Sequence, residues 1–242
     1  MEPSPAEDAG GGGWPAGDNA FRRWHSGGLC PETPARRAMF HVKHAQALVQ
    51  AEEALLRLGL HVSEARLGAY LDAFERWREA ASLSGWRTPD ELVAEGLIPS
   101  LFLVCLARPL PGDRILDLGA GGGVVGIPLA LILPDSDVTL VDSTRKHVVF
   151  LKHVVGKLGL SNVHVEWGRL EAGRVPAEYD LAVARAVNPP GAALRTALSV
   201  LRPGGVAVTW RPDRGALSLK VAPGGSDLSV AAVPAAGEAL QR

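Results

Sequence analysis

The sequence predicts an α/β protein in which a helical region precedes a parallel sheet covered by helices. Beyond Pro109, short apolar runs alternate with helical segments, an order typical of parallel sheets covered on both faces. One apolar run ends at Asp117, meets closely spaced glycines and continues as an apolar helical pattern, as expected where a buried strand turns sharply into a helix. Before Pro109, apolar residues recur at spacings of three and four, which predicts amphipathic helices.

The composition fits one catalytic domain of ordinary size with a smaller segment in front. The 242 residues are 47% hydrophobic, enough for a sizeable core. A formal net charge of -1 gives no global attraction for nucleic acid, so contact with a polyanion has to come from a local basic face. Cys30 and Cys105 fit neither a disulfide framework nor a metal cluster, and no signal peptide or membrane-spanning run is recognisable. We therefore expect a reduced, cytoplasmic protein without a metal site or a membrane partner.

Three regions are expected along the chain. Residues 1–38 combine a glycine run, prolines and mixed charges without apolar periodicity, which predicts a disordered extension. Met39 stands where periodic sequence begins, so translation from that codon would give a compact protein. Residues 39–106 are expected to form a helical cap, and residues 107–242 an α/β core.

The helical cap is expected to contain two amphipathic helices joined near Gly59 and a third helical piece from Pro89 to Leu106. The apolar stripes of the first two run through Leu48, Leu55, Leu58, Leu67, Tyr70, Leu71, Phe74 and Trp77. We interpret them as core, and Ser63 stands where it would cap the second helix. His41 and His44 lie three apart, but two imidazoles without a nearby carboxylate or thiolate make a poor metal site.

Five short strands are predicted in the core. They are Arg114–Leu118, Asp137–Val141, Val163–Trp167, Leu181–Ala184 and Val206–Trp210. Ligands of parallel sheets bind beyond the carboxyl ends of the strands. Asp117, Asp142, Gly168–Glu171 and Arg185 all lie at such ends, so we expect them to converge on one crevice.

The glycine loop can be read in two registers, which imply different cofactors. A dinucleotide fingerprint, G-x-G-x-x-G, can be written on Gly121, Gly123 and Gly126. Asp142 then stands at about the spacing expected for the ribose-binding acid. Alone, this match is weak, and it implies a nicotinamide cofactor.

The second register begins at Asp117 and continues with Gly119, Gly121 and Gly123. It resembles the first motif of Rossmann-like S-adenosylmethionine-dependent methyltransferases. In those proteins the glycines let the loop approach the methionine and ribose portion of the cofactor. The acid that ends the second strand, here Asp142, holds the ribose hydroxyls, and no pyrophosphate needs the helix dipole.

Further motifs favour the second register and point to one family. Leu201–Gly205 reads L-R-P-G-G and resembles a turn common in these methyltransferases. More specific motifs are G-I-P-L at Gly126–Leu129, D-S-x-x-K at Asp142–Lys146 running into Phe150 and Leu151, G-R-x-E at Gly168–Glu171, and R-A at Arg185–Ala186. Together they resemble the glucose-inhibited division protein B family, over about Met39 to Trp210. That family methylates N7 of a guanosine in bacterial small-subunit ribosomal RNA.

The resemblance implies a Rossmann-like, class I methyltransferase fold with an amino-terminal helical cap, and S-adenosyl-L-methionine as the cofactor. The implied partner is small-subunit ribosomal RNA or the assembling small subunit, bound by a monomer. The implied cofactor-binding residues are Asp117, Gly119, Gly121, Gly123, Asp142, Ser143, Arg169, Leu170, Glu171 and Arg185.

Methyl transfer to guanine N7 does not require a general base, because the accepting lone pair already lies in the base plane. The site must align the two reactants, which can contribute about 7 to 11 kcal/mol. Arg185 is the first candidate for orienting the RNA, since its fork can donate to guanine O6. Lys146 is the second, because D-S-x-x-K resembles the position of the family's catalytic-pocket lysine. For either residue, a solvated cation at the end of an element is the alternative.

The segment Arg145–Lys157 carries the local positive charge that the whole chain lacks. It contains Arg145, Lys146, His147, Lys152, His153 and Lys157 without an acid, opposite an apolar stripe. Two interpretations are open: one face contacts phosphate while the other packs on the sheet, or the charges form an ordinary solvated face.

Asn188-Pro189-Pro190 invites comparison with the [DN]-P-P-[YF] motif of adenine amino-group methyltransferases. The fourth residue here is Gly191, which cannot stack on a base. The Arg185–Ala186 motif explains this region better, so we read the prolines as a helix entry.

Several segments depart from the family. Glu95–Ser100 reads E-G-L-I-P-S where members show R-H-x-x-D-S, and Thr209–Arg211 replaces a short lysine-containing motif. After the fifth strand we find one strand candidate, Leu228–Val233, so the final antiparallel strand of the sheet has no candidate. Its loss would leave a gap or an exposed edge.

The predicted function is methyl transfer from S-adenosylmethionine to N7 of a guanosine in small-subunit ribosomal RNA. The departures keep two alternatives open, a diverged paralogue with another substrate and a non-catalytic S-adenosylmethionine-binding or RNA-binding protein. An NAD-dependent oxidoreductase is the least favoured.

Overall fold

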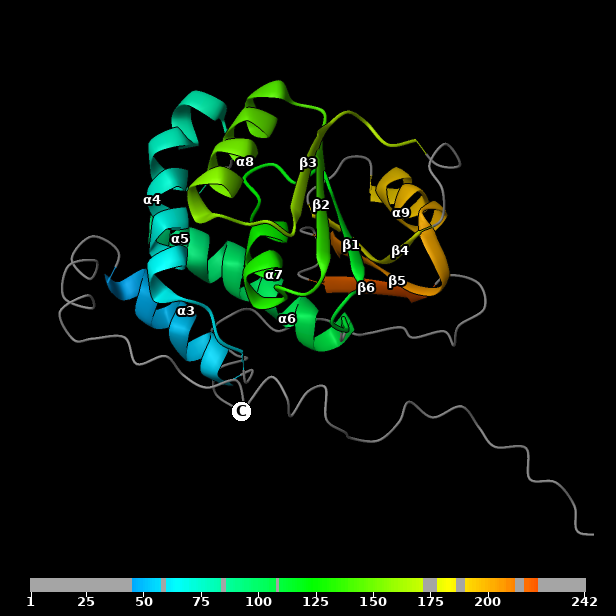
Figure 1. Cartoon of the computed structure of the whole chain (residues 1–242), viewed down its shortest axis with the longest axis horizontal. Helices are drawn as coiled ribbons and strands as arrows, with labels where there is room; N and C mark the ends of the chain where they lie inside the picture. Colours follow the sequence, from blue (N-terminus) through cyan, green and yellow to red (C-terminus); the bar gives the residue numbers. More distant parts are fainter. Residues whose placement is uncertain are drawn as a thin grey trace, which may run out of the picture. The chain divides into compact units, whose positions relative to one another are not determined.

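The computed structural model describes residues 45–57, 60–83, 86–107, 109–171, 178–185, 190–211 and 216–221. Some sequence-based expectations fall outside them: those for residues 1–38, Met39, His41, His44, Gly59, Ala186, Asn188, Pro189 and Leu228–Val233. Figure 1 shows a group of helices, α3 to α6, beside a sheet with further helices, α7 to α9. Within the described ranges, no helix is long and apolar enough to cross a membrane.

The core is a six-stranded sheet in the order β3-β2-β1-β4-β5-β6. Its strands are β1 (Arg114–Leu118), β2 (Asp137–Asp142), β3 (Val163–Trp167), β4 (Tyr179–Arg185), β5 (Leu201–Arg211) and β6 (Ala216–Val221). β1 to β5 pair in parallel, as predicted, and β2, β4 and β5 are longer than expected. Strands β1 and β2 are buried at every position after the first, as expected where helices cover both faces of a parallel sheet.

Strand β6 is not among the strands predicted from the sequence. It runs antiparallel to β5, with Val221 opposite Val206 and Ala216 opposite Arg211. Its sequence, A-L-S-L-K-V, alternates apolar with small or polar residues, the pattern of a strand with one buried face. The pairing satisfies the backbone groups along an edge of β5 that would otherwise be unpaired.

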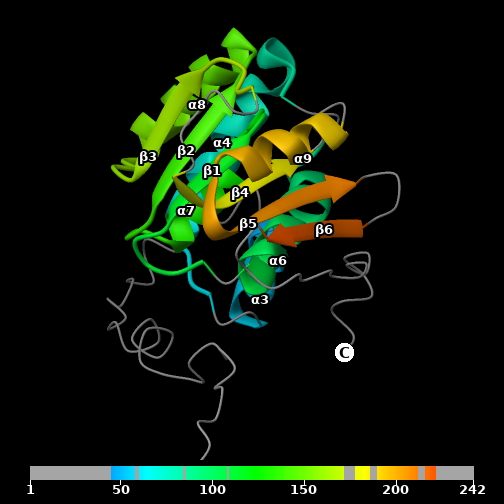
Figure 2. The same cartoon turned by 90° about the vertical axis from the view of Figure 1, so that its right-hand side faces the viewer.

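The sheet order reverses direction between β1 and β4, and this reversal distributes the helices over two faces. Helices α7 (Gly126–Ile132) and α8 (Arg145–Leu158) connect β1 to β2 and β2 to β3, whereas α9 (Pro190–Ser199) connects β4 to β5. Right-handed crossovers that progress in opposite directions place their helices on opposite faces (Figure 2). Ala193 and Ala197 of α9 pack against buried residues of β4 and β5 such as Ala182 and Ala207.

The helical cap consists of α3 (Ala45–Arg57), α4 (Glu64–Ala81), α5 (Pro89–Glu91), η1 (Leu92–Leu97) and α6 (Ile98–Ala107). Ser63 is the N-cap residue of α4, as predicted, but its side chain makes no capping hydrogen bond. The third helical piece is present, with Thr88 Oγ1 accepting from the Glu91 N–H at 3.1 Å at its start. Its middle, η1, is a π-helix, a widened turn that sequence periodicity did not predict.

The cap packs on the core through a line of aromatic rings between α4 and α8, which run beside each other in Figure 1. The ring centroids of Tyr70 and Phe74 lie 6.1 Å apart, and Phe74 contacts Phe150 of α8 at the same distance. Trp77 lies 6.0 Å from Phe150 and 5.3 Å from His153. These edge-on and tilted contacts fix α4 against the helix that follows β2.

Candidate active site

The glycine loop between β1 and α7 has the backbone that its sequence requires. Gly119, Gly121 and Gly123 have φ of +69°, +54° and +71°, in the region that favours glycine. The Gly119 N–H donates to the carbonyl of Val141 on β2 at 2.8 Å, which ties the loop to the neighbouring strand. The loop therefore lies at the point where the strand order reverses, the usual ligand site of such sheets.

Asp117, the acid of β1, is bonded to the end of this loop where α7 begins. It is 1% exposed, and its Oδ2 accepts the Gly126 N–H at 2.9 Å at the start of α7. Burial raises the pKa of Asp117 to about 7, and the negative charge of Asp142 adds to the rise, while the Gly126 bond and the charge of Arg185 oppose it. A Cβ on Gly126 would lie 2.1 Å from Leu140 Cδ2 and 2.9 Å from Asp117 Oδ2, so only glycine fits here.

Asp142, at the carboxyl end of β2, meets the same loop. Its Oδ2 accepts the Gly121 N–H at 2.7 Å, and its Oδ1 accepts the Thr144 N–H at 2.7 Å. His147 Nδ1 lies 3.2 Å from Oδ1, a contact whose angle does not complete a hydrogen bond. Because a carboxylate can accept about four hydrogen bonds, these contacts fix Asp142 and leave it capacity for ligand hydroxyls.

Helix α4 of the cap contacts the glycine loop from the other side. The hydroxyl of Tyr70, a fully buried residue, donates to the Gly122 carbonyl at 2.9 Å. A Cβ on Gly122 would lie 2.5 Å from Phe74 Cε2, so the ring of Phe74 packs directly on the loop backbone. Burial raises the pKa of Tyr70, so its hydroxyl remains a proton donor.

Arg185, at the carboxyl end of β4, is held by the π-helix of the cap. Its Nη1 donates to the Gly96 carbonyl at 2.6 Å and to Ser100 Oγ at 3.1 Å, and its Nη2 donates to the Glu95 carbonyl. The guanidinium also lies 5.1 Å from the ring centroid of Trp86. Burial lowers the pKa of Arg185 to about 10, so it stays protonated at neutral pH.

The other predicted site residues lie near the carboxyl ends of β2 and β3. Lys146 is exposed on the first turn of α8, and Ser143 is exposed just after β2. Arg169 and Glu171 are exposed after β3, whereas Leu170 packs on the hydrophobic cluster around β1 and β4. The structure therefore brings Asp117, the loop glycines, Asp142 and Arg185 to one edge of the sheet, and shows the rest at its rim.

The sequence-based list did not contain several residues that shape the centre. They are Tyr70, Phe74, Trp86, Gly96, Ser100 and Thr144. Tyr70 and Phe74 belong to a stripe that we had interpreted as core, and their burial confirms that interpretation. Ser100 ends the segment 95–100 that departs from the family motif, and helical spacing cannot show which distant residue it contacts.

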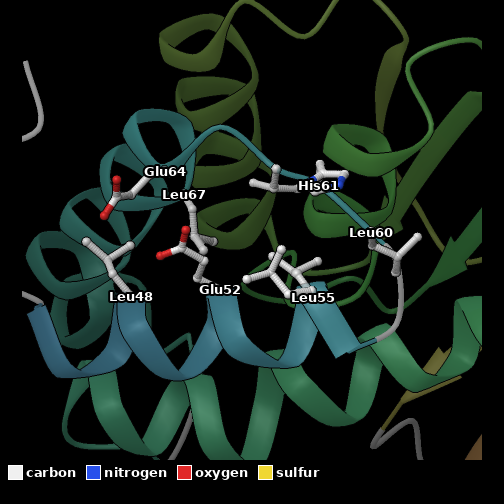
Figure 3. A pocket seen from close by; sticks show the side chains of 9 residues that line it. Leu48, Glu52, Leu55, Leu60, His61, Glu64 and Leu67 are labelled. Carbon is white, nitrogen blue, oxygen red and sulfur yellow. The ribbon is translucent and has the colours of Figure 1, made fainter. Parts of the chain in front are cut away.

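A small cavity of about 60 Å³ lies away from this centre, between α3 and α4 (Figure 3). Its lining is mainly leucine, with Glu52, His61 and Glu64 also present. Small-molecule sites usually have volumes of about 300 to 1,000 Å³, so this cavity is too small for a nucleotide-sized cofactor. Among the described residues, no group of three or more His, Cys, Asp or Glu side chains is arranged to bind a metal ion.

The start of α7 distinguishes between the two cofactors that the loop motif left open. In dinucleotide-binding folds, the pyrophosphate binds to the free N–H groups at the beginning of this helix. Here the Gly126 N–H donates to the buried carboxyl of Asp117, so a pyrophosphate would meet an acid at that position. S-adenosylmethionine has no pyrophosphate and carries a cationic sulfonium, which carboxyl groups at the ends of β1 and β2 would not repel.

Comparison with known proteins agrees with this geometry. Residues 63–222 match the family model described as rRNA small subunit methyltransferase G, GidB. A protein named "Ribosomal RNA small subunit methyltransferase G" from Pseudomonas aeruginosa (strain LESB58) is 39% identical over 146 residues, 60% of this chain and 67% of the relative. Proteins of the same name from Stenotrophomonas maltophilia (strain K279a) and Cellvibrio japonicus (strain Ueda107) are 36% identical over 173 residues and 39% identical over 148 residues. These matches cover 71% and 60% of this chain, and 80% and 68% of the respective relatives. The family match spans more than half of the sequence and includes the glycine loop, Asp142 and Arg185, so the chain belongs to the rRNA small subunit methyltransferase G family.

Proposed function

We propose that this protein transfers the methyl group of S-adenosylmethionine to N7 of a guanosine in small-subunit ribosomal RNA. Membership of the family makes it an S-adenosylmethionine-dependent methyltransferase with a Rossmann-like, class I fold that acts on ribosomal RNA. The observation that supports this cofactor most directly is the bond between Asp117 and Gly126 at the start of α7, because it favours a cation over a pyrophosphate.

The residues of the site divide into those that hold the cofactor and those that orient the RNA. The loop of Gly119, Gly121 and Gly123 gives the cofactor close access to backbone, and Asp142 offers acceptors to its ribose hydroxyls. S-adenosylmethionine supplies an electrophilic methyl group when it is bound. Guanine N7 has its lone pair in the base plane, so the protein has to align the acceptor rather than remove a proton.

Arg185 and Lys146 are proposed to orient the RNA at this site. Arg185 is protonated and lies at the carboxyl edge of the sheet, beside the π-helix of the cap. Lys146 is exposed at the start of α8, next to the turn that holds Asp142. The guanidinium of Arg185 is engaged with cap carbonyls, so contact with RNA would add to those bonds or exchange with them.

The proposal is tested by incubating the protein with small ribosomal subunits that lack the modification and with S-adenosylmethionine labelled in its methyl group. Incorporation of label into the subunit RNA is expected. Calorimetric titration with S-adenosylmethionine and with NAD separates the alternatives. Cofactor binding without label in ribosomal RNA would favour the diverged paralogue or the non-catalytic protein, and binding of NAD alone would contradict the proposal.

The proposal also includes the cellular location and the oligomeric state of the protein. Small ribosomal subunits assemble in the bacterial cytoplasm, so we place the enzyme there. We also propose that it acts as a monomer, because one chain contains both the cofactor loop and the proposed RNA-orienting residues. Light scattering of the purified protein at assay concentration measures the second point directly.

A further inference from the structure

An exposed aromatic residue stands at the carboxyl end of β3, next to the proposed cofactor site. Trp167 is 56% exposed, although it is the last residue of a strand. It pairs in register with Asp142, the proposed ribose-binding acid on β2. A large apolar side chain left in solvent at the ligand-binding edge of a parallel sheet is a candidate contact for a substrate.

The indole ring is held in place by two groups of the chain. Its Nε1–H donates to the Ser143 carbonyl at 3.1 Å, in the turn after β2. The guanidinium of Arg145 lies 4.2 Å from the ring centroid, which is a close cation–π contact. The ring is therefore fixed by a hydrogen bond at its Nε1 and contacted by a cation, while the residue as a whole is 56% exposed.

For the basic segment Arg145–Lys157 the sequence left open a phosphate-contacting face or an ordinary solvated face, and the structure shows its first turn in contact with Trp167. Lys157 Nζ donates to the Ala69 carbonyl on α4 at 3.2 Å, and the ring of His153 lies on Trp77. Lys157 and His153 therefore contact the cap, whereas Lys152 is exposed. Arg145 and Lys146 are exposed on the first turn, and Arg145 contacts Trp167.

We propose that Trp167, Arg145 and Lys146 form a stacking platform for an unpaired base of the RNA substrate and its adjacent phosphate. This inference rests on the proposed function, because it assigns a surface to the substrate of that site. Single-stranded RNA is recognised by stacking of bases on aromatic rings and on guanidinium planes, with nearby cations that contact phosphate. The pair of Trp167 and Arg145 offers an aromatic ring and a guanidinium plane for stacking. Lys146 adds a local positive charge in a protein whose net charge is -1. Glu166 precedes Trp167 in β3, and strand alternation directs it to the opposite face of the sheet.

The platform is tested by fluorescence anisotropy with a labelled single-stranded RNA of about 12 nucleotides, a length suited to platforms of this kind. Trp167→Ala is expected to raise the Kd for this RNA by roughly 5- to 100-fold, and Trp167→Phe by less than about threefold, because it keeps a stacking ring. Arg145→Gln is expected to reduce the slope of log Kd against log salt by about 1. The matched control is Leu110→Ala, which removes an apolar side chain of similar exposure, 51%, in the segment before β1, at the amino ends of the strands.

Calorimetry with S-adenosylmethionine on the same variants separates the platform from the cofactor site. Unchanged cofactor binding together with weaker RNA binding supports the platform. Unchanged RNA binding in Trp167→Ala, or equal losses in Trp167→Ala and Leu110→Ala, overturns it. If Trp167→Ala loses cofactor binding and keeps RNA binding, the ring contacts the adenine of the cofactor instead, and this result would also overturn the platform. Because the probe is a short RNA and the readout is binding, absence of methyl transfer to small subunits would contradict the proposed function without deciding this test.

Discussion

The Tyr70 hydroxyl in the helical cap donates a 2.9 Å hydrogen bond to the Gly122 carbonyl in the glycine loop, across 52 residues of sequence. Phe74, one turn further along α4, packs against the same glycine. The cap therefore packs against the glycine loop and helps to fix its backbone conformation. This relationship leads to the first two predictions below.

Tyr70→Phe removes the hydrogen bond and keeps the ring. The Gly122 carbonyl then loses a partner in a buried place, which costs about 1 to 3 kcal/mol. We expect the Kd for S-adenosylmethionine to rise by roughly threefold to tenfold, because part of this free energy is lost when the loop departs from its binding conformation. Calorimetric titration measures it. Tyr179→Phe, at the amino end of β4, removes the hydroxyl of a second buried tyrosine and should bind the cofactor as wild type does. Equal losses in the two variants would contradict the prediction.

Gly122→Ala tests the packing of Phe74 on the loop. The added Cβ would lie 2.5 Å from Phe74 Cε2, so α4 or the loop has to move, and we expect a loss of roughly 1 to 3 kcal/mol in the free energy of unfolding. Gly156→Ala, on α8, is the control: its Cβ would meet nothing within 4 Å, and a helix interior favours alanine over glycine by about 0.5 to 1 kcal/mol. Urea denaturation compares both variants. Combining Gly122→Ala with Phe74→Leu should recover part of the loss, whereas simple addition of the two losses would argue against a direct clash.

Arg185→Lys keeps the positive charge at this position and removes the planar, forked guanidinium. Lysine cannot reproduce the bonds to the Glu95 and Gly96 carbonyls and to Ser100 in one planar geometry. Loss of one charge-assisted bond costs about 1.5 to 3 kcal/mol, so we expect kcat/KM for small subunits to fall at least about tenfold. Ser100→Ala removes one partner of Arg185 without changing residue 185 and should cost stability with little effect on kcat. Wild-type turnover by Arg185→Lys would contradict a need for the guanidinium fork at this position.

Asp117 should make the stability of the protein depend on pH. The folded state raises the pKa of this carboxyl to about 7, so between about pH 4 and pH 7 the folded state holds a proton that the unfolded state has released. The free energy of unfolding contributed by Asp117 therefore falls as pH rises through this window, by roughly 4 kcal/mol at most, and levels off above pH 7. Asp117→Asn keeps an acceptor for the Gly126 N–H and lacks the titration. Urea denaturation at pH 5 and pH 8 should show a smaller loss with pH in this variant, and identical losses would contradict a raised pKa at Asp117.

The sheet could be read from the sequence to a large extent because its strands are nearly continuous apolar runs. Strands β1 and β3 have the bounds that were predicted, Arg114–Leu118 and Val163–Trp167. The π-helix η1 was not predicted, because an additional residue in a helical turn leaves no mark in apolar spacing. Strand β6 was not predicted either, because a short alternating run pairs with β5 only through a contact that local sequence does not contain.

The sequence placed the loop glycines and Asp142 at neighbouring strand ends, and it did not indicate which groups of the cap meet them. The parallel topology brings these carboxyl ends together, and the structure adds a hydrogen bond from the Gly121 N–H to Asp142 that was not predicted. Apolar spacing predicted that Tyr70 faces inward, but only the tertiary structure shows that its hydroxyl meets the loop. The carbonyls of η1 that hold Arg185 are backbone groups, so no residue type signals them.

The most direct test of the account is to identify the methylated nucleoside in small-subunit RNA. Subunits lacking the modification are incubated with the protein and S-adenosylmethionine, and their RNA is digested and analysed by mass spectrometry, with Arg185→Lys in parallel. The account predicts 7-methylguanosine at one position, at a level that falls in the Arg185 variant. Methyl groups on another base or another guanine atom, or an unmodified RNA despite cofactor binding, would contradict it.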